Sequence, residues 1–126
     1  MHQIFLTSPV VAGSDAGDLV YFVNPTGETI VVDAVILVPA VSVAANSESN
    51  YIVTTVAGPG GTIASHSTKQ TGGTALTAGT AKALTVSGTG TEIEVAANGM
   101  ISVTVADNGT CPAYEHHIAL RCHKQR

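Results

Sequence analysis

Hydrophobic and polar residues alternate with a period of two along much of the chain, which is the spacing of a β-strand. The strongest run covers residues 29–38, where both alternating sets are largely apolar. We expect a central strand that is covered on both faces or lies at a subunit contact. Pro39 has no N–H to donate, so it ends this strand or marks an edge, and Asp33 within the strand needs a partner or exposure.

Turn signals divide the rest of the chain into further short strands. Proline presets φ and glycine adds freedom in the turn at residues 24–27, and Asn98-Gly99 is a strong hairpin signal. Residues 71–80 are low in complexity and typical of a loop, and no segment has a helical period with caps. About eight or nine strands with frequent turns predict an all-β antiparallel sandwich or barrel. The other expected strands are residues 4–6, 19–23, 51–57, 62–68, 82–86, 92–95, 100–106 and 114–122.

The length of 126 residues fits one domain. We assign residues 19–122 to the sandwich, residues 1–18 to an N-terminal arm or loop, and residues 123–126 to a basic C-terminal tail. Small Val, Ala and Thr side chains bury little area each, and many short strands create sheet edges that have to be covered, charged or paired. We therefore expect partner subunits to contribute to stability.

Charge is scarce and unevenly distributed along the chain. Five Lys and Arg stand against nine Asp and Glu, and 11% of residues are charged, compared with about 25% in an average domain. The net charge of -4 argues against a nucleic-acid partner, and 44% hydrophobic residues argue against disorder throughout. The first basic residue is Lys69, and three of the five basic residues occupy the last six positions. No signal peptide or membrane-length apolar stretch is recognised, so we expect no membrane partner and folding in the cytoplasm.

The two cysteines, Cys111 and Cys122, are expected to be thiols. A strand over residues 115–122 would extend about 23 Å at ~3.3 Å per residue. The Cα atoms of the two cysteines would then lie too far apart for a disulfide, which requires about 4.4–6.8 Å.

The segment that precedes the C-terminus has the residue types of a metal site, with Glu115, His116, His117, Cys122 and His123 close together in sequence. On a strand, His117 and His123 share one face at a separation of about 20 Å, and His116 points to the other face. Two such residues cannot bind one zinc ion at ~2.1 Å each. We expect structural histidines, with a histidine site shared across a symmetric oligomer as the alternative.

Residue types used in nucleophilic catalysis occur without the arrangement that catalysis needs. Ser65, His66 and Asp107 are not accompanied by a G-x-S-x-G motif, and neighbouring side chains on a strand point to opposite faces. The glycine-rich residues 58–61 lack the Gly-Lys-Ser/Thr ending of a phosphate-binding loop. We predict no catalytic or cofactor-binding residue, and a protein that is not an enzyme.

Two acidic pairs are candidates for carboxylate chemistry. Glu92 and Glu94 would lie about 6.6 Å apart on one strand face, a spacing comparable to that of glycosidase carboxylates, but few aromatic residues are available to line a sugar cleft. Asp15 and Asp18 flank Gly17 in a possible calcium loop, but too few ligands accompany them. We expect both pairs to be solvated, and no metal site.

Two long segments carry a resemblance to a known family. Residues 19–39 (LVYFVNPTGETIVVDAVILVP) and residues 75–106 (ALTAGTAKALTVSGTGTEIEVAANGMISVTVA) resemble the small Thr/Val/Ala/Gly-rich β-sandwich proteins of tailed bacteriophages. Those proteins sit on the outside of the phage head as decoration, or cement, subunits. The resemblance extends over about residues 18–122 and rests on strand spacing and composition. It implies a jelly-roll-like sandwich, a symmetric oligomer that is often a trimer, binding at capsomer junctions, and no catalytic residues.

These observations lead to the hypothesis of a virion structural protein that decorates the outer surface of a phage capsid. Its partners would be the major capsid protein and copies of itself in a homotrimer, and the contacts would involve the arm at residues 1–18, the strand at residues 30–38 and the basic tail. The alternatives are a tail or fibre subunit and a carbohydrate-binding module. A carbohydrate-binding module would need exposed aromatic residues, and the three tyrosines, Tyr21, Tyr51 and Tyr114, lie on separate expected strands.

Overall fold

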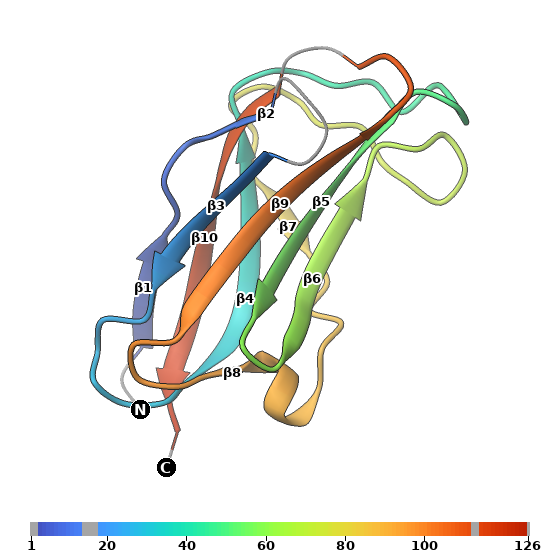
Figure 1. Ribbon diagram of the computed structural model, residues 1–126. Helices are drawn as coiled ribbons and strands as arrows, with labels where there is room; N and C mark the ends of the chain where they lie inside the picture. Colours follow the sequence, from blue (N-terminus) through green and yellow to red (C-terminus); the bar gives the residue numbers. More distant parts are fainter. Residues whose placement is uncertain (1–2, 14–17, 112–113, 126) are drawn as a thin grey trace.

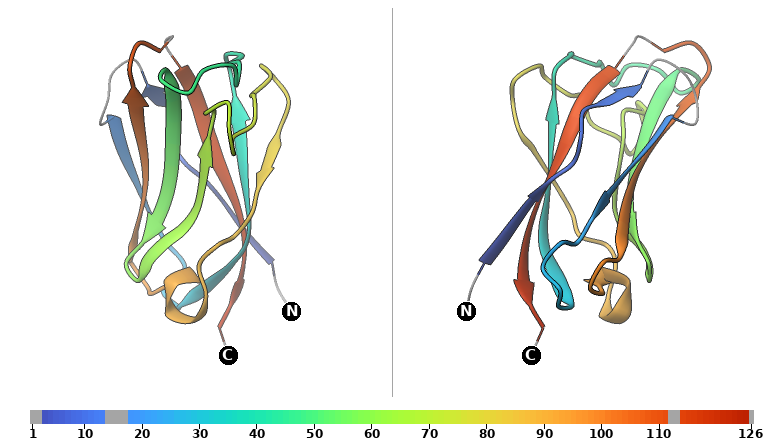
Figure 2. Two further views of the ribbon diagram at one scale, coloured as in Figure 1. Left: turned by 90° about the vertical axis from the view of Figure 1, so that its right-hand side faces the viewer. Right: turned by 60° about the vertical axis from the view of Figure 1, so that its left-hand side comes forward.

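The computed structural model describes residues 3–13, 18–111 and 114–125. These residues form two antiparallel sheets packed face to face, with one short 3-10 helix and no α-helix among them (Figures 1 and 2). The predicted all-β antiparallel sandwich is therefore confirmed. The elements are β1 (Gln3–Thr7), β2 (Val11–Gly13), β3 (Asp18–Val23), β4 (Ile30–Pro39), β5 (Tyr51–Gly58), β6 (Gly61–Ser67), β7 (Lys82–Leu84), η1 (Gly90–Ile93), β8 (Glu94–Val95), β9 (Met100–Asn108) and β10 (Tyr114–Lys124).

The two sheets differ in size and in how their strands are ordered. The six-stranded sheet has the order β1-β10-β4-β7, with β2 also paired to β10 and β8 paired to β4. The four-stranded sheet has the order β3-β9-β5-β6. Most neighbouring strands are distant in sequence, and the β5–β6 hairpin is the exception among the described strands. The chain therefore crosses repeatedly between the layers, and one continuous apolar core lies between them.

The central strand β4 matches its prediction closely. Its inward residues Ile30, Val32, Val35 and Leu37 are buried, and the outward residues are half-buried except for Asp33, which is exposed. A β-bulge in the pairing with β10 leaves Asp33 without a register partner. The extra residue shifts the alternation of side chains by one position. Ile30 and Val32 before the bulge, and Val35 and Leu37 after it, can therefore all face the core.

The segment expected to be an N-terminal arm is instead part of the six-stranded sheet over residues 3–7. Strand β1 pairs with β10 of the same chain, from Gln3 opposite His123 to Thr7 opposite Ala119. This pairing lets Ile4 and Leu6 pack against the core, which a free arm would leave in water. The expected tail is also bound to the domain, because β10 continues to Lys124 and the Gln125 N–H donates to the Thr29 carbonyl over 3.0 Å.

Two local predictions between β7 and β9 are wrong. The expected strand at residues 92–95 is the 3-10 helix η1 followed by the two-residue strand β8. The Asn98-Gly99 turn is present, with Asn98 at φ 61°, but it connects strands in different sheets and does not close a hairpin. The Asn98 N–H donates to the Asn24 carbonyl, and the Asn24 N–H donates to the Gly99 carbonyl. The turn is thus bound to the loop after β3, which carries the chain from one sheet to the other.

The loop at residues 71–80 is confirmed as irregular, but it contributes to the core. Leu76 is buried and forms an isolated bridge with Val43. Both residues of this bridge belong to the hydrophobic core.

Candidate interaction surface

The outward side chains within residues 19–23, 53–57, 62–67 and 100–106 of the four-stranded sheet carry no charge, whereas at one end of this face the Lys69 ammonium lies 5.4 Å from the ring centre of outward-facing Tyr51. Alternation along each strand turns apolar residues inward and leaves a second set of side chains facing outward. We call this outward set the charge-free face. Its members are Leu19, Tyr21 and Val23 of β3, Met100, Ser102, Thr104 and Ala106 of β9, Val53, Thr55 and Ala57 of β5, and Thr62, Ser65 and Ser67 of β6.

The most apolar part of the charge-free face lies along its β3 edge. Leu19, Tyr21 and Val23 are 45%, 55% and 41% exposed, and Met100, which pairs with Val23, is 47% exposed. We call these four residues the β3 strip. Contiguous apolar side chains of this size on a monomer surface usually mark an interaction site.

The outer face of the six-stranded sheet differs, because exposed Asp33 of β4 and exposed Glu115 and Arg121 of β10 place charge on it. Ala34, Ile36 and Val38 of β4 are half-buried there, and Arg121 of β10 is exposed opposite Ala34. Phe5 of β1, opposite Arg121, is 70% exposed. The expectation that β4 lies at a subunit contact stays a prediction.

Charged side chains gather near the end of the sandwich where β4 begins and β10 ends. His123 Nδ1 lies 2.8 Å from the Asp33 carboxylate, which supplies the partner that the sequence required for this acidic residue. Lys124 Nζ lies 2.8 Å from the Glu28 carboxylate, with both side chains about half exposed, so this ion pair contributes little to stability. The basic residue Lys124 of the expected tail thus faces an acidic residue of its own chain.

The histidines occupy the faces that the strand period predicted. His116 is buried in the core, and His117 lies on the outer face. The His116 ring stacks on Tyr114 with the ring centres 4.3 Å apart, and neither of its ring nitrogens has a hydrogen-bond partner. Burial lowers the pKa of His116 to about 4, with a smaller contribution from His117, so the buried ring is neutral at pH 7. No group of three or more metal-ligating side chains is found within the described ranges.

The candidate catalytic residues are not brought together. Ser65 is exposed on the outer face, whereas His66 points inward and its Nε2 lies 2.8 Å from Thr74 Oγ1. Burial, and secondarily the charge of Lys82, lower the pKa of His66. Asp107 lies on β9, in register with Ile52 of β5.

The two acidic pairs have local structural roles where the structure describes them. Glu92 accepts a hydrogen bond from the Thr89 N–H over 2.9 Å and caps η1, and Glu94 accepts one from Gln125 Nε2 over 2.6 Å. The expectation that Glu92 and Glu94 share one strand face is wrong, because Glu92 belongs to the 3-10 helix. Asp15 lies outside the described residues, and Asp18 begins β3.

Both cysteines are free thiols, as predicted. The Cys111 thiol donates to the Tyr51 carbonyl over 3.3 Å, and Cys122 is fully buried on the inner face of β10. Burial raises the pKa of Cys122 to about 12, with an added contribution from Asp33, and it also raises the pKa of Cys111.

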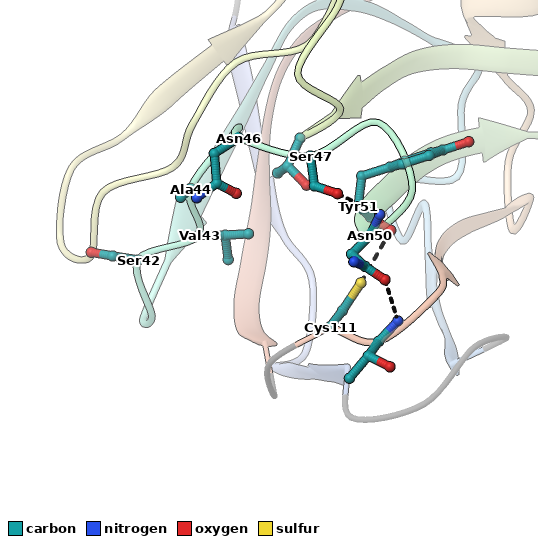
Figure 3. Close-up of a pocket in the computed structure, with 10 residues that line it drawn as sticks. Ser42, Val43, Ala44, Asn46, Ser47, Asn50, Tyr51 and Cys111 are labelled. Atoms are coloured by element: carbon teal, nitrogen blue, oxygen red, sulfur yellow. Dashed lines mark hydrogen bonds between the residues drawn. The ribbon is translucent and has the colours of Figure 1, made fainter.

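A cavity of about 240 Å³ opens at the end of the sandwich near Cys111, and Tyr51 is the one aromatic residue among the described residues that line it, beside hydroxyl, amide and small apolar side chains (Figure 3). The tyrosines do not form a sugar-stacking platform around it. Tyr114 is fully buried, the Lys69 ammonium lies 5.4 Å from the Tyr51 ring centre, and Tyr21 is exposed on the distant strand β3. The carbohydrate-binding alternative therefore lacks a supporting arrangement of aromatic residues.

Comparison of the chain with protein-family models, with curated proteins and with solved structures gave no match. The described residues include no helix of the length and apolar character that a membrane span requires. The surfaces described above are therefore the basis for a functional proposal.

Proposed function

We propose that the protein is a virion structural protein that binds the outer surface of a phage capsid as a decoration, or cement, subunit. The charge-free face and its β3 strip are the observation that carries this proposal, together with the sequence resemblance to phage decoration proteins. In this proposal the protein acts as an oligomer of identical chains, for which the resemblance implies a homotrimer. Its partners are the major capsid protein and its own copies.

The composition of the charge-free face suits burial against a protein shell. Removing a charged group from water without a partner costs several kcal/mol, whereas the Thr and Ser hydroxyls of this face can exchange water for polar groups of a partner. Each subunit contact can be weak, because an oligomer that binds at several points gains affinity from avidity. A protein that binds only the assembled shell stabilises the shell by mass action.

The test uses heads of the phage that encodes this chain, prepared without it. Purified protein is added, and binding is measured by co-sedimentation and by the temperature at which the heads release their DNA. Thr55→Lys places a charge near the middle of the charge-free face, opposite Thr104. We expect at least a tenfold loss of affinity, because the new ammonium group must be desolvated without a partner.

Ala83→Lys is the matched control, because Ala83 is an exposed residue on the six-stranded sheet. We expect it to bind heads like the unmodified protein. Equal binding by Thr55→Lys and the unmodified protein would exclude the charge-free face as the contact. If the unmodified protein does not bind heads at all, the decoration proposal fails, and binding to purified tails would support the tail or fibre alternative.

A further inference from the structure

The four edges of the two sheets are protected to very different degrees. Strand β1 has no bulge, lysine or proline, but exposed Arg121 lies opposite Phe5 on the face beside it. At the β6 edge, a bulge opposite Val56 and Ala57 interrupts the strand, and the N–H groups of Ser87 and Gly88 donate to the Ile63 carbonyl over 2.9 and 3.2 Å. Strand β7 is only three residues long. Bulges, covering segments and short strands all hinder edge-to-edge association. This side of the sandwich is therefore guarded.

Strand β3, on the other side, is an open edge. It has six residues, lies at the end of the four-stranded sheet, and pairs only with β9 among the described strands (Figure 1). Its register with β9 runs without a bulge from Asp18 opposite Val105 to Val23 opposite Met100. No lysine, proline or bulge protects residues 19–23, so, as far as the described part of the chain shows, their outward backbone groups are available to a further strand.

The sequence of β3 is self-complementary when two copies are placed antiparallel about Tyr21. Leu19 of one copy then faces Val23 of the other, Val20 faces Phe22, and Tyr21 faces itself. Every opposed pair is apolar, and no like charges meet within these five positions. The outward residues of this pairing are Leu19, Tyr21 and Val23, so the β3 strips of the two copies would lie side by side and shield each other from water.

We propose that two copies of this chain associate through β3, in antiparallel register about Tyr21, to form one continuous eight-stranded sheet. Opposed residues of an antiparallel pair lie on the same face of a sheet. The two charge-free faces therefore become one surface, in line with the proposed function. A two-fold pair is a different assembly from the homotrimer that the family resemblance implies, and mass in solution separates the two.

The first test is the mass of the full chain in solution by size-exclusion chromatography with light scattering. The chain has a mass of 12.7 kDa, and we expect a species of twice that mass. Tyr21→Lys should give the monomer, because it places two ammonium groups opposite each other at the two-fold axis. Phe5→Lys is the control, since Phe5 is a similarly exposed aromatic residue on a different strand, and it should remain a dimer. A monomeric or trimeric unmodified protein, or a dimeric Tyr21→Lys variant, would overturn the two-fold pairing.

The second test determines the register of the β3–β3 pairing by disulfide formation between introduced cysteines. The variants are made in a Cys111→Ser background, and the remaining native thiol, Cys122, is protected from oxidation by burial. Opposed Cα atoms of an antiparallel pair lie about 4.5–5.5 Å apart, which suits a disulfide. Oxidised glutathione takes up the two electrons and two protons of the two thiols and is reduced to two glutathione molecules. Tyr21→Cys should therefore form a covalent dimer by itself.

Leu19→Cys and Val23→Cys provide the register control. Each cysteine would lie about 13 Å along the strand from its own copy, so neither variant should cross-link alone. An equimolar mixture of the two variants should form the mixed dimer. Cross-linking of Leu19→Cys alone, or none for Tyr21→Cys, would refute the register. These results do not depend on head binding, so a failed pairing leaves the decoration proposal standing, and a failed decoration proposal leaves the pairing intact.

Discussion

Acidification should destabilise this protein mainly through the fully buried histidine His116. His116 is 1% exposed, stacks on Tyr114, and has no hydrogen-bond partner at either ring nitrogen. The Tyr114 hydroxyl also lacks a hydrogen bond of good geometry, although nearby Thr54 opposes part of the pKa rise that burial causes there. Among the described residues no hydrogen-bond partner stabilises a positive charge on the His116 ring, so the folded chain binds a proton there only at a lower pH than the unfolded chain does.

The magnitude follows from the difference between the folded and unfolded pKa of His116. Burial places the folded pKa at about 4, and the ordinary value in an unfolded chain is 6.5. Above pH 6.5 both states are neutral and the full stability is present. Below pH 6.5 the unfolded state binds more protons, so the free energy of unfolding falls until the pH drops below about 4. The expected loss is about 2 kcal/mol between pH 7 and pH 5, and about 3 kcal/mol in total.

Urea unfolding at pH 7 and pH 5 measures this loss, and His116→Phe isolates its source. Phenylalanine keeps an aromatic ring beside Tyr114 and cannot take up a proton, so the variant should lose about 2 kcal/mol less than the unmodified protein between the two pH values. At pH 7 its stability should be similar, because no hydrogen bond is removed. His117→Gln, on the outer face, should keep the original pH dependence. His66 also has a lowered pKa, but it contributes equally to both proteins. Equal losses in the unmodified protein and His116→Phe would refute the reasoning.

Three further predictions concern other buried groups. Asn24→Ala should destabilise the protein by about 3 kcal/mol in urea unfolding, because the buried Asn24 amide donates to the carbonyls of Val95 and Glu28, and a loss below about 1 kcal/mol would contradict this role. A thiol reagent should modify Cys111 in the folded protein and Cys122 only in urea, and rapid modification of both thiols without urea would count against the burial of Cys122. The buried Cys122 thiol has its pKa raised from 9.0 to about 12, so stability should be constant up to about pH 9 and fall above it, and Cys122→Ala should reduce that alkaline loss.

The long strands could be predicted from sequence because their evidence is local. Alternation in β10 places His116 inside and His117 outside, and the β-branched run of β4 identifies a central strand, without any knowledge of neighbours. Short elements escaped prediction because tertiary contacts define them. Glu92 looks like a strand residue until its carboxylate is seen to cap the turn at Thr89. The Asn98-Gly99 signal specifies a turn, but it does not specify which strands the turn connects.

The charge-free face could be predicted only in part, for the same reason. The scarcity of charge is visible in the composition, but a face exists only once β3, β9, β5 and β6 are known to be neighbours. One signal was available in the sequence. The alternate positions from Met100 to Ala106 and from Val53 to Ala57 lack charge, whereas solvated strand faces usually carry some. The β1 pairing was missed because a five-residue strand gives too little period to separate an arm from an edge strand.

The placement of the few charges connects composition with surface. The ion pairs of Lys124 with Glu28 and of Asp33 with His123 lie where β4 begins and β10 ends, and Glu115 and Arg121 add charge to the outer face of the six-stranded sheet. Most of the outer face of the four-stranded sheet is left without charge. Charged side chains on a sheet face or edge are the usual protection against unwanted association. The fold applies steric protection at β6 and β7 but leaves the β1 and β3 edges open, and of these two only β3 lies beside the charge-free face. A free monomer gains nothing from this asymmetry, whereas a subunit that is covered on one side in its assembly needs protection only on the other.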